Sequence, residues 1–344
     1  MLKQITVISG KGGTGKTTLT AAFASLATNA LIADCDVDAA DLHLILHPES
    51  TSKLDFYGME VASININKCS ACGICRERCR FGAISKDLFI DEHACEGCGV
   101  CALICPEDAI IMKEHKAGEI YRSITRFGPL AHARLGIGEE TGGKLVSMVR
   151  KNASEMAAMD DIDLIDLIVI DGPPGTGCSV IASISGVDLV FIVTEPSISG
   201  VHDLERVLEV AAHFGIRMVV CINKYNVNEE KTALIEEYCK SKGVEVVGKL
   251  PLSEIPTKAM LESKTVIEYD DGVFSGTIRD MWHKIITCDT SKKSDTNFWF
   301  QMYGSVYFRA YIYLKLIYIK LVYWFIPLTA SKIPINRCRT LHFS

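Results

Sequence analysis

Short runs of apolar residues recur along this chain and predict buried β-strands. Six runs have this character, at residues 4–9, 30–34, 164–171, 189–194, 217–223 and 244–250. Each run is continuous rather than alternating, which is typical of strands that are covered on both faces. Helical patterns separate several of them, at Thr17–Leu26, Gly200–Phe214 and Glu229–Lys242. The alternation predicts an α/β fold built on a doubly wound, mainly parallel sheet.

The segment at 61–113 interrupts this alternation and contains an internal repeat. Each half reads Cys-x-x-Cys-Gly-Ile/Val-Cys, three residues, Cys, a small turn and then Ala-Ile. Such a repeat predicts two similar lobes related by a pseudo-two-fold axis. The predicted organisation is a discontinuous core of residues 1–60 and 114–286, with a small α+β domain inserted at 61–113.

Composition narrows the class of protein. Eight of the fourteen cysteines lie within residues 69–105. The apolar run at 5–8 is short and is followed at once by a glycine-rich loop, so it is not expected to be an export signal. Clustered thiols without such a signal favour metal ligation in a reducing compartment, so a cytoplasmic location is expected. The net charge of −6 gives no whole-chain argument for binding nucleic acid or an anionic membrane.

The glycine-rich loop predicts a phosphate site. It reads Gly10-Lys-Gly-Gly-Thr-Gly-Lys16-Thr17 and lies between a predicted strand and a predicted helix. Its backbone N–H groups and the positive end of the helix suit phosphate oxygens. Lys16 is expected to reach the β- and γ-phosphates, and the Thr17 hydroxyl to bind Mg²⁺. The nucleotide-binding set in this loop is Gly10, Gly12, Gly13, Thr14, Gly15, Lys16, Thr17 and Thr18.

With its early lysine, this loop resembles that of the MinD/ParA/nitrogenase iron protein superfamily, and residues 1–286 are similar to members that contain an inserted ferredoxin domain. The resemblance implies that Lys11 reaches the partner's ATP across a homodimer interface; alternatively, Lys11 is a solvated loop lysine. It implies that Asp36 orients or deprotonates the attacking water. Asp171 closes an apolar strand and is expected to hold Mg²⁺ through water. Gly172 resembles a γ-phosphate sensor, and Asn223 an adenine-recognition residue.

The two cysteine runs resemble those of two-cluster bacterial ferredoxins, in which the fourth cysteine of each run serves the other cluster. Carried over here, the first 4Fe–4S cluster takes Cys69, Cys72, Cys75 and Cys105. The second takes Cys95, Cys98, Cys101 and Cys79. Zinc is disfavoured because it requires two Cys-x-x-Cys pairs for each ion rather than tight triplets. The first run ends Cys79-Arg80 where the second ends Cys105-Pro106, and a cation there is expected to favour the reduced state of the second cluster.

Two segments carry no clear assignment. Residues 123–144 include His132, Arg134, Glu139 and Glu140, which are expected to contact a partner, to couple the insert to the nucleotide switch, or to lie in a solvated loop. The tail at 287–344 lacks Asp and Glu from Thr296 onward and is rich in tyrosine. It is interpreted as a basic interfacial helix, as an artefact of a frameshift or read-through, or, least favoured, as a membrane span.

Three functions follow from these patterns. The leading hypothesis is an ATPase that couples its nucleotide state to electron transfer through two 4Fe–4S clusters, with an unidentified redox protein as donor or acceptor. The second is an iron–sulfur carrier or assembly ATPase, although residues 239–288 lack the Cys-x-x-Cys that such members use. The third is a MinD-like positioning switch that senses redox state, with the tail as its membrane contact.

Overall fold

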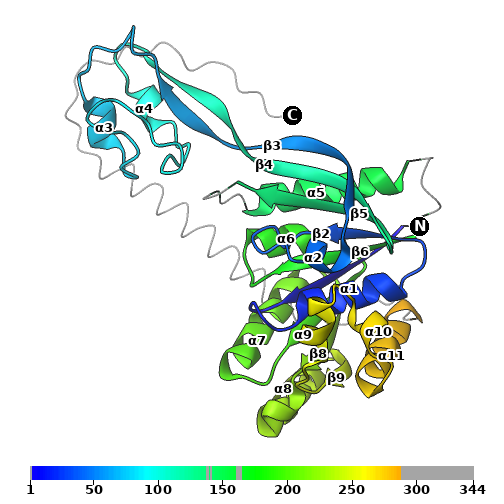
Figure 1. Ribbon diagram of the computed structural model, residues 1–344. Helices are drawn as coiled ribbons and strands as arrows, with labels where there is room; N and C mark the ends of the chain where they lie inside the picture. The colour runs from blue at the N-terminus through cyan, green and yellow to red at the C-terminus, as the bar shows by residue number, and fades with distance from the viewer. Residues whose placement is uncertain (1, 137–138, 140–141, 160–164, 288–344) are drawn as a thin grey trace. The chain divides into compact units, whose positions relative to one another are not determined.

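The computed structural model describes residues 2–136, 139, 142–159 and 165–287 (Figure 1). The predicted tail at 287–344 therefore lies outside the described residues, apart from Thr287 itself. The described strands form one sheet in the order β3-β4-β5-β2-β6-β1-β7-β8-β9. Their bounds are β1 Lys3–Ser9, β2 Ala30–Asp34, β3 Glu49–Ile64, β4 Ile110–Thr125, β5 Gly128–Leu135, β6 Leu167–Pro174, β7 Leu189–Thr194, β8 Arg217–Asn223 and β9 Glu245–Leu250.

The helices lie mostly in the connections between strands. Their bounds are α1 Lys16–Leu26, α2 Leu42–Leu46, α3 Ile74–Arg78, α4 Val100–Leu103, α5 Gly142–Ala157, α6 Cys178–Ile184, α7 Ile198–His213, α8 Glu229–Ser241, α9 Ile255–Leu261, α10 Val266–Tyr269 and α11 Val273–Thr287, with a short 3₁₀ turn, η1, at Tyr225–Val227.

The six predicted strands are confirmed as β1, β2 and β6 to β9. Along the sheet, every neighbouring pair in the part β5-β2-β6-β1-β7-β8-β9 is parallel. The mainly parallel sheet predicted from the apolar runs is thus the fold observed. Because parallel strands all end at the same edge, the loops after β1, β2, β6, β7 and β8 lie close together.

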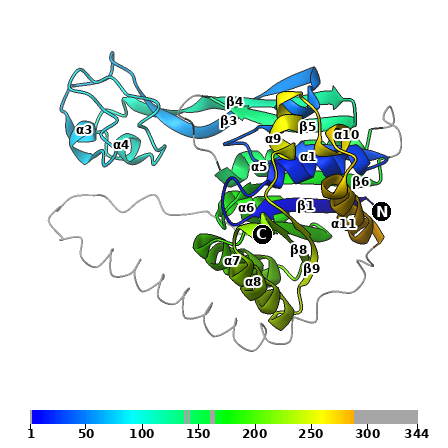
Figure 2. The same cartoon turned by 60° about the horizontal axis from the view of Figure 1, so that its bottom comes forward.

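Helices cover both faces of the parallel part of the sheet (Figures 1 and 2). On one face, α5, α6, α7 and α8 contribute Leu145, Val180, Leu204 and Ile235 to a single buried cluster. On the other face, α1 and α11 pack through Phe23, whose ring lies 5.2 Å from that of Trp282. Burial on both faces explains why the strands are continuously apolar.

An antiparallel edge, β3-β4-β5, was not predicted. Strand β4 pairs antiparallel with both β3 and β5. The β3–β4 ribbon carries the cysteine segment between its strands, so α3 and α4 lie side by side beyond its end (Figure 1). Both strands run through the predicted boundaries at 60/61 and 113/114, so the ribbon belongs to the sheet and to the insert.

Within the part of the chain that the structure describes, no helix is long and apolar enough to cross a membrane.

Candidate functional site

The glycine-rich loop joins β1 to α1 at the carboxyl edge of the sheet. Gly13 and Gly15 have positive φ angles of 77° and 94°, which residues with a side chain rarely adopt. A Cβ atom on Gly15 would also lie 2.5 Å from Nδ2 of Asn223. The loop conformation therefore requires glycine at these two positions, and Gly15 leads directly into the first turn of α1.

Asp171, at the carboxyl end of β6, is the centre of a buried polar cluster. Its carboxylate accepts hydrogen bonds from Lys16 at 2.9 Å, from Thr17 at 2.8 Å and from Thr20 at 2.8 Å. The Lys16 ammonium lies 3.0 Å from Oδ2 of Asp36, which follows β2. Thus four of the predicted site residues, Lys16, Thr17, Asp36 and Asp171, lie together, although they come from three separate parts of the chain.

The charges in this cluster shift one another's protonation. Burial opposes the positive charge of Lys16, but the carboxylates of Asp171 and Asp36 outweigh it and raise the pKa of the ammonium group. Burial raises the pKa of Asp34 well above its usual range, and the charge of Asp171 adds to the shift. Burial also raises the pKa of Asp36, while Lys16 opposes that rise. Lys16 is therefore cationic at neutral pH, and Asp36 is more basic than a free carboxylate.

The residues present suit a nucleotide. The Thr14 hydroxyl is buried and has no hydrogen-bond partner among the residues that the structure describes, so it can donate to a phosphate oxygen. A cavity of about 230 Å³ opens beside the loop, lined by Gly13, Thr18, Asn223, Pro251 and neighbouring residues. Asn223 is fixed there because its Nδ2 donates to the backbone oxygen of Thr14 at 2.8 Å. This cavity adjoins the loop through Gly13, Gly15 and Thr18, and its use by an adenine base stays a prediction.

The residues also suit a magnesium ion. A threonine hydroxyl next to a carboxylate is a donor set that Mg²⁺ accepts, and Thr17 Oγ1 lies 2.8 Å from Asp171 Oδ2. In the structure, the Lys16 ammonium donates a hydrogen bond to the other carboxylate oxygen of Asp171, Oδ1.

Gly172 is held tightly between strands. A Cβ atom at this position would lie 2.6 Å from Cγ2 of Ile8 and 3.0 Å from the backbone oxygen of Val7. Glycine is thus required by the close approach of β6 to β1. The predicted contact of its N–H with the γ-phosphate is a separate matter and stays a prediction.

Lys11 is engaged by its own chain. Its Nζ lies 2.6 Å from Oε1 of Glu195 and donates to the hydroxyls of Ser197 and Ser199, each at 3.0 Å. Glu195 also pairs with Lys224 at 2.9 Å. Burial raises the pKa of Glu195, but hydrogen bonds from the two lysines outweigh this and lower it. Lys11 is thus ion-paired within its own chain although its side chain is 30% exposed. Its reach to a partner's nucleotide stays a prediction.

The two halves of the cysteine repeat share one backbone conformation. Positive φ angles occur at equivalent positions, in the pairs Ala71 and Gly97, Gly73 and Gly99, and Gly82 and Asp108. The helices α3 and α4 begin directly after the second of these pairs. The lobes surround a small apolar core of Ala62, Cys75, Ile84, Ile90 and Ile110, and four more cysteines pack against it, Cys79, Cys95, Cys101 and Cys105.

The thiols within each lobe are neighbours. Burial raises the pKa of Cys75, and nearby Cys69 and Cys72 raise it further. Cys101 behaves in the same way beside Cys95 and Cys98. Backbone N–H groups point at three of the sulfurs, from Ala71 to Cys69 at 3.4 Å, from Ala62 to Cys95 at 3.5 Å and from Ala109 to Cys105 at 3.3 Å.

All twelve described cysteines are free thiols. Among the described residues, no group of three or more His, Cys, Asp or Glu side chains is arranged to hold a single metal ion. Six of the eight cysteines are thus two triplets of nearby thiols, Cys69, Cys72 and Cys75 in one lobe and Cys95, Cys98 and Cys101 in the other. The binding of 4Fe–4S clusters by the eight cysteines stays a prediction. The exchange of Cys79 and Cys105 between the lobes stays a prediction.

Most of the described residues of the segment 123–144 lie in strands β4 and β5 or at the start of α5. Gly128–Leu135 forms strand β5, and His132 within it is buried and lies 2.9 Å from the hydroxyl of Ser123. Burial lowers the pKa of His132 to about 4, with the charge of Arg134 adding to the shift. Glu139 contacts His115, which lies on β4. Glu140 lies outside the described residues.

Several functional partners were missed by the sequence reasoning. They are Thr20, which binds Asp171, and the set Glu195, Ser197 and Ser199 around Lys11. The signal was weak but present, because Glu195 directly follows the apolar run of β7. Polar residues at the carboxyl ends of parallel strands meet at one edge of a sheet.

Comparison with known proteins identifies the family. Residues 5–266 match the CobQ/CobB/MinD/ParA nucleotide binding domain, so the chain belongs to this family. An uncharacterized protein of Methanocaldococcus jannaschii is 36% identical over 231 residues, which are 66% of this chain and 80% of the relative. A second uncharacterized protein of that organism is 28% identical over 251 residues, or 69% of this chain and 89% of the relative.

Solved structures agree with the fold. The septum site-determining protein MinD of Pyrococcus horikoshii, in complex with Mg-ADP, has a TM-score of 0.50 to this chain. The match covers 83% of this chain and 96% of the MinD chain at 18% identity. At that identity the likeness shows the fold alone.

Proposed function

We propose that this protein is a Mg²⁺-dependent ATPase that couples its nucleotide state to electron transfer through two 4Fe–4S clusters. The observation that carries the proposal is the placement of the eight cysteines. They form two matched lobes on a ribbon whose strands belong to the same sheet as the nucleotide loop. A displacement at the carboxyl edge of this sheet therefore has a continuous path to the lobes.

In this proposal the nucleotide site uses the buried cluster around Asp171. The phosphates lie in the loop at 10–18, with Lys16 leaving the carboxylates to contact the β- and γ-phosphates. Mg²⁺ is held by Thr17 and, through water, by Asp171. Asp36, whose pKa is raised, orients or deprotonates the attacking water. The base lies in the cavity beside Asn223, and Gly172 faces the terminal phosphate. The Mg-ADP bound to the related MinD fold supports this choice of ligand.

The cysteines of the insert would hold the clusters in the two sets of four given above. The clusters supply one-electron transfer. The N–H groups of Ala62, Ala71 and Ala109 reduce the negative charge on their sulfurs and so make reduction easier. A homodimer with ATP at its interface and an unidentified redox protein complete the proposal.

The test is an anaerobic ATPase assay on the protein with its clusters oxidised and then reduced. A rate difference of at least about threefold, lost in the Cys72→Ser and Cys98→Ser variants, is the expected result. These changes should each lower the iron content from about eight to about four per chain. Equal rates in the wild type would reject the coupling. Transfer of iron and sulfide to an apo-ferredoxin would instead favour the carrier function.

A further inference from the structure

Glu139 lies in the connection between β5 and α5 and is anchored to the sheet. The N–H of Gly136 donates to the backbone oxygen of Ala117 on β4 at 2.8 Å, and the N–H of Glu139 donates to the oxygen of Gly136 at 3.3 Å. The Glu139 carboxylate lies 2.8 Å from Nε2 of His115. Its side chain is only 14% exposed, so this contact is largely shielded from water.

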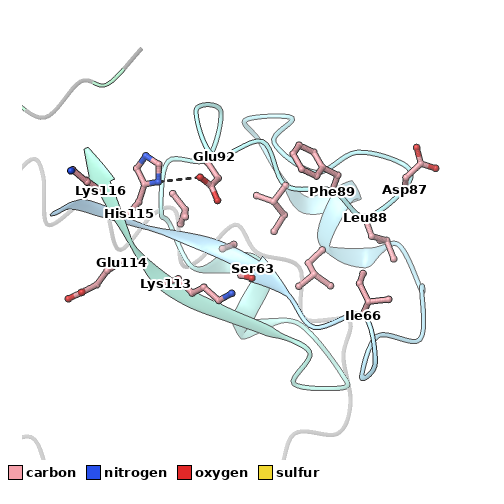
Figure 3. A pocket seen from close by; sticks show the side chains of 14 residues that line it. Ser63, Ile66, Asp87, Leu88, Phe89, Glu92, Lys113, Glu114, His115 and Lys116 are labelled. Carbon is pink, nitrogen blue, oxygen red and sulfur yellow. Dashed lines mark ion pairs between the residues drawn. The ribbon is translucent and has the colours of Figure 1, made fainter. Parts of the chain in front are cut away.

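His115 faces a second carboxylate on its other side. Its Nδ1 lies 3.4 Å from Oε2 of Glu92. Figure 3 marks this ion pair with a dashed line. Glu92 belongs to the cysteine segment, three residues before Cys95. The neighbouring His93 lies 3.6 Å from the same Glu139 oxygen that contacts His115. One imidazole on β4 thus joins the β5–α5 connection to the second cysteine lobe.

The same connection shares a cavity with the segment that follows Asp36. Gly136, Glu139 and Gly142 line a cavity of about 920 Å³ together with Val37, Asp38 and His43. Val37 and Asp38 directly follow Asp36, whose side chain contacts Lys16. If Lys16 leaves Asp36 to bind a phosphate, residues 37–43 can move. Such a movement would reshape the cavity that these residues line together with Glu139.

We propose that Glu139 and His115 are positioning residues that transmit the nucleotide state from the Asp36–His43 segment to the second cysteine lobe. The inference deepens, and rests on, the redox-linked ATPase function proposed above. The Glu139 carboxylate hydrogen-bonds to one nitrogen of the imidazole, and the Glu92 carboxylate lies 3.4 Å from the other, so the ring stands between the core and the lobe. A hydrogen bond to a carboxylate is about twice as strong as one between neutral groups. Neither residue belongs to the set assigned to the nucleotide.

The experiment is hydrogen exchange, read by mass spectrometry, on the cluster-loaded, full-length protein with and without a non-hydrolysable ATP analogue. In the wild type, analogue binding should slow exchange in peptides covering 88–95 and 113–118. In Glu139→Gln and His115→Gln this response should fall at least about fivefold, while the Kd of the analogue stays within about twofold. His283→Gln, at an exposed site on α11, is the matched control and should respond as the wild type does.

Two results would overturn the proposal: an unchanged exchange response in both variants, or no response in the wild type. The iron content and ultraviolet–visible spectrum of each variant establish that the lobes are loaded and folded. The ATPase rates in the oxidised and reduced states separate the two proposals. If the wild type shows the exchange response but its ATPase rate does not depend on the redox state, the redox-linked function is rejected. The positioning role of Glu139 and His115 is then still supported.

Discussion

His132 is a polar side chain that the fold turns into a core residue. It is 4% exposed, its ring stacks on that of Tyr121 at 5.0 Å, and it bonds with Ser123. Burial and then the charge of Arg134 lower its pKa to about 4, against about 6.5 in an unfolded chain. The imidazole is therefore neutral at pH 7, and its polar appearance in the sequence carries no catalytic meaning.

This shift predicts a pH dependence of stability. Between about pH 6.5 and pH 4 the unfolded chain binds a proton at His132 that the folded chain does not, so the free energy of unfolding falls as the pH falls. We expect a loss of up to about 3 kcal/mol from this residue, and a flatter profile for His132→Gln. Urea unfolding at several pH values measures it, with His283→Gln as control. Parallel profiles for the wild type and His132→Gln would contradict the assignment.

Asp34 behaves in the opposite direction. Its folded pKa is raised, chiefly by burial, so above about pH 4 the unfolded chain releases a proton that the folded chain retains. The wild type thus loses stability as the pH rises from about 4 through the folded pKa. The Asp34→Asn variant has no carboxyl group to titrate and therefore does not lose stability in this way. Its amide oxygen can still accept the hydrogen bond from the N–H of Asp36. We expect a gain of about 1–3 kcal/mol at pH 7.5 that disappears near pH 4, against no gain for the exposed Asp280→Asn.

At the level of elements, the parallel strands were predictable and the antiparallel edge was not. Strands β1, β2 and β6 to β8 are largely buried on both faces, so each gives a nearly continuous apolar run. The edge strand β9 is only partly buried, with Glu245 and Lys249 exposed. Strand β3 is exposed along most of its length, and its buried and exposed residues do not alternate regularly. Its position in the sheet is therefore set mainly by backbone pairing with β4. Sequence patterns report side-chain burial, and a ribbon that buries little leaves no such pattern.

The same reasoning explains what could be predicted of the site. Lys16, Thr17, Asp36 and Asp171 each stand at a position that the local sequence marks, at the end of a strand or the start of a helix. Thr20 lies inside α1, and its bond to Asp171 depends on how α1 packs against β6. The grouping of Glu139 with His115 joins segments that are adjacent only because β4 pairs with β5. Such contacts exist only in the folded sheet.

The junction of β1 and β6 yields a prediction at this scale. In Gly172→Ala the new methyl group would lie 2.6 Å from the Ile8 side chain and 3.0 Å from the backbone of Val7, so the two strands must separate. We expect a loss of about 2–4 kcal/mol in the free energy of unfolding. Gly276→Ala, on helix α11 with no atom within 4 Å of the new Cβ, is the control and should gain about 0.5–1 kcal/mol. Equal effects of the two changes would refute the steric account.

At the scale of the whole molecule, the contacts that Lys11 makes within its own chain affect the formation of the proposed homodimer. A lysine that reaches a partner's nucleotide must first leave Glu195, Ser197 and Ser199 of its own chain. In the proposed ATP-bound dimer, those contacts would stabilise the single chain and so oppose association. The balance between the two sets of contacts would then set the ATP concentration at which two chains associate, because a ligand that binds only the dimer shifts the equilibrium by mass action.

Weakening the contacts of Lys11 within the chain should therefore favour the dimer. Ser199→Ala removes one hydrogen bond to Lys11 and leaves Glu195 and Lys224 in place, so we expect half-maximal dimer formation at about two- to fivefold lower concentration of an ATP analogue. Lys11→Ala should abolish the dimer, because it removes the group that would cross the interface. Light scattering after gel filtration measures both. Dimerisation by Lys11→Ala as readily as by the wild type would show that Lys11 acts only within its own chain, with Glu195 as its permanent partner.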